Sequence, residues 1–133
     1  MTQVLKTFPP NYEEICKYIP AVKKNHNIVF TYGNTIYSPA GIEISRDLMA
    51  HEEAHIARQS NPKEWWDKYL LDVRFRLKEE LIAYRTQYQY ALKYYNREAR
   101  RQLLSHIASD LSSAMYGSLI TKQQARKLIT ETK

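Results

Sequence analysis

Hydrophobic positions in the second half of the chain recur every three or four residues, which is the spacing of one face of an α-helix. The clearest run, residues 73–95, carries Leu77, Leu81, Tyr84, Tyr88, Leu92 and Tyr95. Similar spacing predicts helices over residues 63–72 and 98–115. Thr121 and Gln124 form a capping-box pattern that opens a last short helix. We therefore expect a long C-terminal helical region.

The first half of the chain gives shorter signals. Residues 11–18 predict a short helix, and residues 28–32 and 35–38 are rich in β-branched and aromatic side chains. Gly33 and Asn34 separate the two β-like runs by a two-residue connection of the hairpin type. The predicted fold class is α+β and mostly helical, with a small β-hairpin that precedes a further helix and the C-terminal helical region.

The helix after the hairpin contains the pattern HExxH. His51 and His55 are four residues apart, so their side chains share one face and can bind one Zn²⁺. Glu52 lies about 100° further round the helix and can reach a water on the metal without ligating it. The extended pattern HExxHxxGxxH is excluded, because Arg58 and Asn61 stand where Gly and His would be needed.

A catalytic zinc site needs a third protein ligand, and a later helix offers two adjacent carboxylates. Glu80 lies between Leu77 and Tyr84 on their shared stripe, so it faces the protein interior. A carboxylate on an inward stripe is costly unless something pairs with it, and a metal ion would do so. Glu80 is therefore the predicted third ligand. Glu79, about 100° away and nearer the outer face, is the second choice.

With this ligand set the chain resembles the gluzincins, zinc metallopeptidases in which a Glu on a second helix completes HExxH, and small bacteriophage proteins of that kind. The resemblance covers roughly residues 28–90 and includes the runs 36–39, 48–50, 65–66 and 75–76. It implies a single zincin-like metallopeptidase domain over residues 1–133, of minimal size. It also implies that His51, His55 and Glu80 bind zinc and that Glu52 is the general base in peptide hydrolysis.

The resemblance carries two further expectations. The strand before the motif helix often borders the substrate cleft in the family, a place that residues 35–38 would take here. Many larger gluzincins have an Asp four residues after the Glu ligand, where it orients a metal-bound His. Tyr84 occupies that position in this chain, so Asp67, Asp72 or a backbone carbonyl would have to serve instead.

Peptide hydrolysis also needs a donor that stabilises the tetrahedral oxyanion. Tyr84, Tyr88 and His106 are the candidates in this sequence, and each has an alternative role in the core or on the surface. The substrate would be a peptide or protein.

Composition indicates in what kind of protein such a site would lie. The chain has 133 residues, of which 44% are hydrophobic and 26% are charged, as in ordinary globular domains. The single cysteine, Cys16, supplies neither a disulfide framework nor a thiolate zinc site, and we expect it to be buried. No apolar run approaches the ~18 residues that span a bilayer, and the polar start is not a secretory signal. We expect a cytoplasmic protein without a membrane partner or, if it comes from a phage, one of the host cytoplasm or the virion.

Charge and tyrosine content favour two other functions. The net charge is +6 and there are eleven tyrosines, a residue common at protein interfaces. One alternative is a non-catalytic virion or assembly protein with a structural zinc site that contacts other virion proteins. The other is nucleic-acid binding by the interleaved basic and aromatic residues of 84–101. An amphipathic helix with tyrosines inward and cations outward explains the same stretch.

Overall fold

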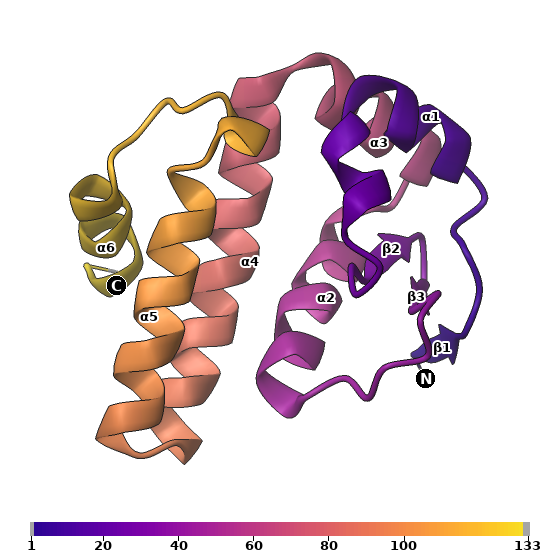
Figure 1. Ribbon diagram of the computed structural model, residues 1–133. Coiled ribbons are helices and arrows are strands. Elements are labelled where there is room, and N and C mark those ends of the chain that lie inside the picture. The colour runs from indigo at the N-terminus through magenta and orange to yellow at the C-terminus, as the bar shows by residue number, and fades with distance from the viewer. Residues whose placement is uncertain (1, 132–133) are drawn as a thin grey trace.

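The computed structural model describes residues 2–131 and confirms a mostly helical α+β fold (Figure 1). Its elements in chain order are β1 (Gln3–Leu5), α1 (Tyr12–Tyr18), the 3₁₀ helix η1 (Pro20–Lys24), β2 (Phe30–Tyr32), β3 (Thr35–Tyr37), α2 (Arg46–Arg58), α3 (Pro62–Leu71), α4 (Val73–Tyr94), α5 (Arg97–Leu111), the 3₁₀ helix η2 (Ala114–Tyr116) and α6 (Lys122–Thr130).

The predicted hairpin is present as part of a three-stranded sheet. β2 and β3 pair antiparallel, and Gly33 in their connection adopts a φ of 63°, a left-handed conformation that suits glycine. The third strand, β1, was not predicted from the sequence; it pairs parallel to β3 with Val4 opposite Ile36. The strand order is therefore β1-β3-β2, with β3 in the centre.

Side-chain caps lie at the starts of α3, α4 and α6, close to where the sequence predicted these helices to begin. Asn61 caps α3 and Asp72 caps α4, because each side chain accepts a backbone N–H of the following first turn. The predicted capping box of Thr121 and Gln124 at α6 is confirmed. The helix expected over residues 98–115 ends earlier, at Leu111, and the chain continues into η2.

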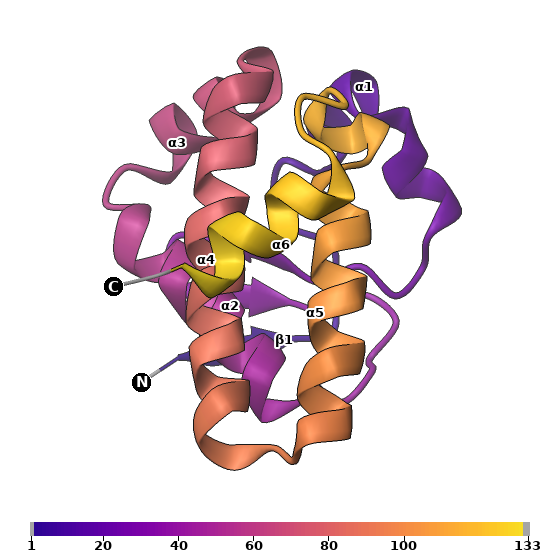
Figure 2. The ribbon, with the colours of Figure 1, turned by 90° about the vertical axis from the view of Figure 1, so that its left-hand side faces the viewer.

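Helices α2 and α4 pack against each other at the centre of the molecule (Figure 1). The sheet lies on the far side of α2, and α5 lies against the other side of α4. Figure 2 shows α6 crossing the outer face of α4 and α5. The α2–α4 contact therefore lies between two packed parts of the fold.

Each of these two parts has its own hydrophobic cluster. The first joins α1, η1, β2 and α3 through Ile15, Cys16, Ile19, Val22, Phe30, Trp65, Trp66, Tyr69 and Leu70. The second joins α4, α5 and α6 through Tyr84, Ile107, Ala108, Leu111, Ala125 and Ile129. Cys16 is buried, as expected.

Candidate metal centre

Helix α2 presents its HExxH residues on a buried face. Ser45 caps the helix by accepting a backbone N–H of the first turn over 3.4 Å. His51, Glu52 and His55 are each 5% exposed, whereas Glu53 is exposed. The rotation of about 100° between consecutive helical residues thus separates Glu52 from Glu53.

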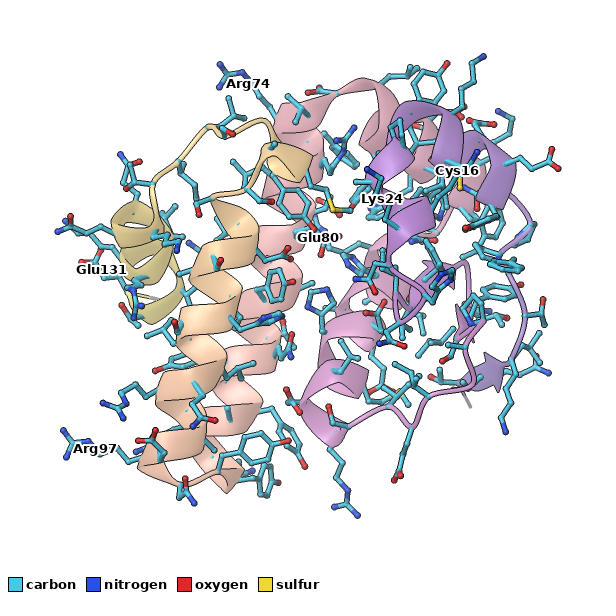
Figure 3. All side chains as sticks on the ribbon, in the orientation of Figure 1. Cys16, Lys24, Arg74, Glu80, Arg97 and Glu131 are labelled. Carbon is cyan, nitrogen blue, oxygen red and sulfur yellow. The ribbon has the colours of Figure 1, made fainter. Side chains whose placement is uncertain are left out.

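The two imidazoles converge on Glu80 of α4. His51 Nε2 lies 3.0 Å, and His55 Nε2 lies 3.2 Å, from the same Glu80 Oε1. Ligand atoms at about 2.0–2.1 Å from a tetrahedral metal ion are roughly 3.3 Å apart, so these donors have nearly the required spacing. The three side chains form a buried group that could hold a metal ion, and Figure 3 shows Glu80 between α4 and α2.

The second oxygen of Glu80 is also held. Tyr69 of α3 donates its hydroxyl to Glu80 Oε2 over 2.7 Å. Burial alone would raise the pKa of Glu80, but the charge and hydrogen bonds of the two imidazoles outweigh burial and hold that pKa well below its ordinary value. Glu80 is therefore a carboxylate with one oxygen fixed by Tyr69 and the other directed at the imidazoles.

The prediction that Glu79 faces outward is wrong. Glu79 is 1% exposed and accepts hydrogen bonds from Arg58 Nε at 2.8 Å, Arg58 Nη2 at 2.9 Å and Trp65 Nε1 at 2.8 Å. Burial favours its neutral form, yet the hydrogen bonds from Arg58 and Trp65 keep the pKa of Glu79 below its ordinary value. Glu79 is consequently the anion of a structural ion pair and does not join the metal-binding group.

A chain of three side chains contacts the other nitrogen of His51. His51 Nδ1 lies 3.0 Å from Gln87 Oε1, and Gln87 Nε2 donates to Asp47 Oδ2 over 2.8 Å. Tyr95 donates to the other oxygen of Asp47 over 2.6 Å. The chain connects the first turn of α2 to the C-terminal end of α4.

The expectation that Asp67 or Asp72 accepts a hydrogen bond from a metal-binding imidazole is wrong. Asp67 is half-buried and pairs with Lys63 at 2.9 Å, and Asp72 accepts two backbone N–H groups at the start of α4. Within residues 2–131, the buried Nδ1 of His55 has no hydrogen-bond partner. The two imidazoles thus have different surroundings despite their equivalent places in the motif.

Glu52 lies beside the convergence point. Its Oε1 accepts the hydroxyl of Thr31 over 2.8 Å, and its Oε2 is 3.9 Å from His51 Nε2. Burial raises the pKa of Glu52, and the two imidazoles oppose that rise only in part. One oxygen of Glu52 is therefore anchored to β2, while the other is free to take up a proton next to the metal-binding group.

A pocket of about 290 Å³ adjoins these residues. Its polar end is formed by the metal-binding group and Glu52, and its rim includes Asn25, Asn27 and His106. The apolar wall of the pocket includes Ile15, Ile19, Val22, Ile28 and Met115. Thr31 of β2 also lines the pocket. Residues 35–38 do not line it, so the expectation that they border the cleft is wrong; β3 is the central strand of the sheet.

The three predicted oxyanion donors are in different places. The Tyr84 ring meets the His51 ring edge-on at 4.5 Å between centroids, but its hydroxyl donates to Asp110. His106 is exposed at the pocket rim. Tyr88 packs against the α4–α5–α6 cluster and does not line the pocket.

Several residues that support the group were not identified from the sequence. Tyr69 belongs to the helix predicted over residues 63–72, and the available signal was that a buried tyrosine usually needs a partner for its hydroxyl. Asp47 was an ordinary acidic residue of a first turn, and nothing in the sequence distinguished Gln87 or Thr31. Their roles depend on contacts between residues at least 11 positions apart in the chain.

The chain was compared with protein families, curated proteins and solved structures. No protein-family model, curated protein or solved structure matches this chain. Over residues 2–131, none of the helices has both the length and the apolar character that crossing a membrane requires.

Proposed function

We propose that the protein is a zinc-dependent hydrolase of peptide bonds, with His51, His55 and Glu80 as metal ligands and Glu52 as the general base. The observation that carries the proposal is the approach of His51 Nε2 and His55 Nε2 to a single Glu80 oxygen beside a pocket. Two imidazoles and one carboxylate form a ligand set of catalytic zinc sites. The adjoining pocket favours a fourth position open to water or substrate, as opposed to the closed coordination of structural sites.

The side chains around the group suit hydrolysis. Bound zinc would supply Lewis acidity toward a carbonyl oxygen and would lower the pKa of a coordinated water toward ~7. Glu52 Oε2 would take a proton from the attacking water as the water oxygen bonds to the carbonyl carbon, and would release that proton to the leaving amine as the C–N bond breaks. Thr31 holds the other oxygen of Glu52 in place. A pKa raised by burial matches this role, because a base is most effective when its pKa is near the working pH.

The donor for the oxyanion is proposed to be His106. Its imidazole is exposed at the pocket rim, whereas the Tyr84 hydroxyl is already bonded to Asp110 and Tyr88 lies outside the pocket. Tyr84 also lines the pocket, but only His106 of the three candidates lines it without a hydrogen bond to another side chain in residues 2–131.

The pocket walls indicate how a peptide would approach. The edge of β2 is partly covered, because Gln59 donates to the Thr31 carbonyl and accepts from the Gly33 N–H, and Trp66 also donates to Thr31. A peptide would therefore lie along residues 25–29 and place an apolar side chain against the α1–η1 wall.

The test uses two pairs of adjacent glutamates, so that each variant has a matched control. Glu80→Gln should abolish stoichiometric zinc binding, measured by metal analysis of purified protein, whereas Glu79→Gln should keep zinc and lose only stability. Glu52→Gln should keep zinc and abolish cleavage of a peptide library, whereas Glu53→Gln, at an exposed position, should keep both. Cleavage retained by Glu52→Gln would overturn the assignment of the base.

The same variants separate this function from a structural zinc protein of a virion or other assembly. In that case Glu52→Gln would change nothing and removal of the metal would unfold the protein. Zinc bound equally by wild type and Glu80→Gln would contradict both readings of the site.

A further inference from the structure

The amide of Gln87 can adopt only one orientation that satisfies its neighbours. Asp47 accepts a hydrogen bond from Tyr95 and faces Gln87 with its second oxygen. Burial opposes ionisation of Asp47, but the hydrogen bonds from Tyr95 and Gln87 outweigh it and lower the pKa, so the group is an ionised acceptor near neutral pH. An acceptor requires the NH₂ of Gln87, so the Gln87 carbonyl oxygen must face His51.

This orientation determines which nitrogen of His51 carries a proton. The Gln87 oxygen, 3.0 Å from His51 Nδ1, can only accept, so Nδ1 must be the donor. A neutral imidazole with its proton on Nδ1 has a lone pair on Nε2. Nε2 faces Glu80 Oε1, 3.0 Å away, so either a second proton or a metal ion can bridge the two atoms.

We propose that Asp47 and Gln87 are positioning residues that hold His51 in its Nδ1–H form and thereby keep Nε2 available to the metal. The inference rests on the proposed metal site, but the protonated nitrogen is a property that the metal-free protein also has. Both residues are buried, with Gln87 5% and Asp47 8% exposed, so water cannot easily replace either partner.

The neighbouring imidazole provides an internal comparison. In the described part of the chain, His55 Nδ1 is buried without a partner, so no equivalent chain of side chains orients His55. Loss of the Asp47–Gln87 chain should therefore change the His51 ring and leave the His55 ring as it is. A general loss of packing would affect both rings.

The experiment follows the ring nitrogens by NMR in protein labelled with ¹⁵N-histidine, and measures zinc affinity in parallel. In wild type, a hydrogen-bonded Nδ1–H of His51 should be visible with and without zinc. Gln87→Leu should lose that signal and weaken zinc binding by about 10–100-fold, as expected when the partner of a metal-bound imidazole is removed. Gln89→Leu, at an exposed position of the same helix, should match wild type.

A double substitution guards against variants that merely unfold. Asp47→Asn makes both partners amides, which can pair in either sense, so His51 should show a mixture of Nδ1–H and Nε2–H forms. Gln87→Glu alone places two carboxylates together and should be destabilised. The combination of Asp47→Asn with Gln87→Glu exchanges acid and amide, so an acceptor faces His51 again and the Nδ1–H signal should return.

Two results would overturn the proposal. One is a folded Gln87→Leu variant that keeps the Nδ1–H signal and binds zinc within about twofold of wild type. The other is an exchanged pair that folds but does not restore the signal. If wild type binds no zinc, the proposed function fails, and the NMR comparison of the metal-free variants still decides whether this chain orients His51.

Discussion

Two adjacent glutamates on α4 show that the direction of a side chain determines whether it can join the metal-binding group. Glu80 faces the imidazoles of α2, while Glu79 faces Arg58 and Trp65. Both are buried, and each is balanced by its own partners, so burial alone does not identify the ligand. The difference is the rotation of about 100° between consecutive residues of a helix.

Zinc binding should compete with a proton at His55. Burial lowers the pKa of this imidazole, but the Glu80 carboxylate outweighs burial and raises the pKa to about 9 in the metal-free protein. Below that pH the imidazole holds a proton that zinc must displace, so zinc affinity should rise about tenfold per pH unit as the pH approaches 9. Chelator-competition titrations across neutral pH measure the slope. An affinity independent of pH would contradict the prediction, and His26→Ala, at an exposed position, should leave the slope unchanged.

Acid should remove the stabilisation that Glu79 provides. Because its folded-state pKa is below its ordinary value, this stabilisation is complete above the unfolded-state pKa and is lost as the pH falls through the folded-state pKa. Glu79→Gln should lower the free energy of unfolding by about 1–3 kcal/mol at neutral pH, since Arg58 loses a charged partner. Urea unfolding with a chelator present should show the difference from wild type shrinking toward pH 3. A difference that stays constant with pH would disprove the prediction.

At the scale of elements, the site depends on α2 and α4 lying side by side, with short segments completing its walls. α3 supplies Tyr69 to Glu80, β2 supplies Thr31 to Glu52, and α1 with η1 supplies the apolar wall. Each element contributes through a contact that is distant in sequence. We therefore expect substitutions in α1 and η1 to alter selectivity without altering metal binding.

Val22 in η1 tests the role of the wall. Val22→Ala should enlarge the pocket, shift a peptide-library cleavage profile toward bulkier apolar side chains and leave zinc stoichiometry unchanged. Because Val22 is buried, stability should fall by about 2 kcal/mol. Val4→Ala, at a 42% exposed position of β1, is the control and should change neither property. The same cleavage profile in Val22→Ala and wild type would show that the wall does not select the substrate.

At the scale of the whole molecule, positive charge is distributed unevenly. Residues 73–131 carry eleven Lys and Arg against five Asp and Glu, whereas residues 2–72 carry eight against nine. Arg74, Lys78 and Arg85 lie on one face of α4, opposite the face that carries Glu80. The net charge of the described chain thus belongs to the α4–α6 half.

This asymmetry predicts weak, non-specific binding of nucleic acid through the helical half. Binding to a duplex oligonucleotide, followed by fluorescence anisotropy, should weaken steeply as salt rises. Reversing two exposed charges with Arg74→Glu and Lys78→Glu should reduce the salt slope by about two, or one for each lost phosphate contact. Lys17→Glu with Lys24→Glu is the matched control in the other half, and equal effects of the two pairs would contradict the prediction.

The sequence predicted those parts of the fold that depend on local chemistry. Period-3.6 spacing located α3, α4 and α5, and the capping box of Thr121 and Gln124 marked the start of α6. The HExxH spacing placed two imidazoles on one face, and the inward stripe of α4 selected Glu80. The three-residue strand β1 is too short for a recognisable pattern and forms only because it pairs with β3.

The sequence by itself therefore determined where the longer helices and the hairpin form and which side chains share a helical face, because helical geometry depends on neighbours along the chain. Only the tertiary structure decided that Glu79 pairs with Arg58, that Gln87 and Asp47 contact the motif, and that β2 and η1 line the pocket. These contacts join residues 21 to 40 positions apart, and the packing of α2 on α4 and on the sheet brings them together.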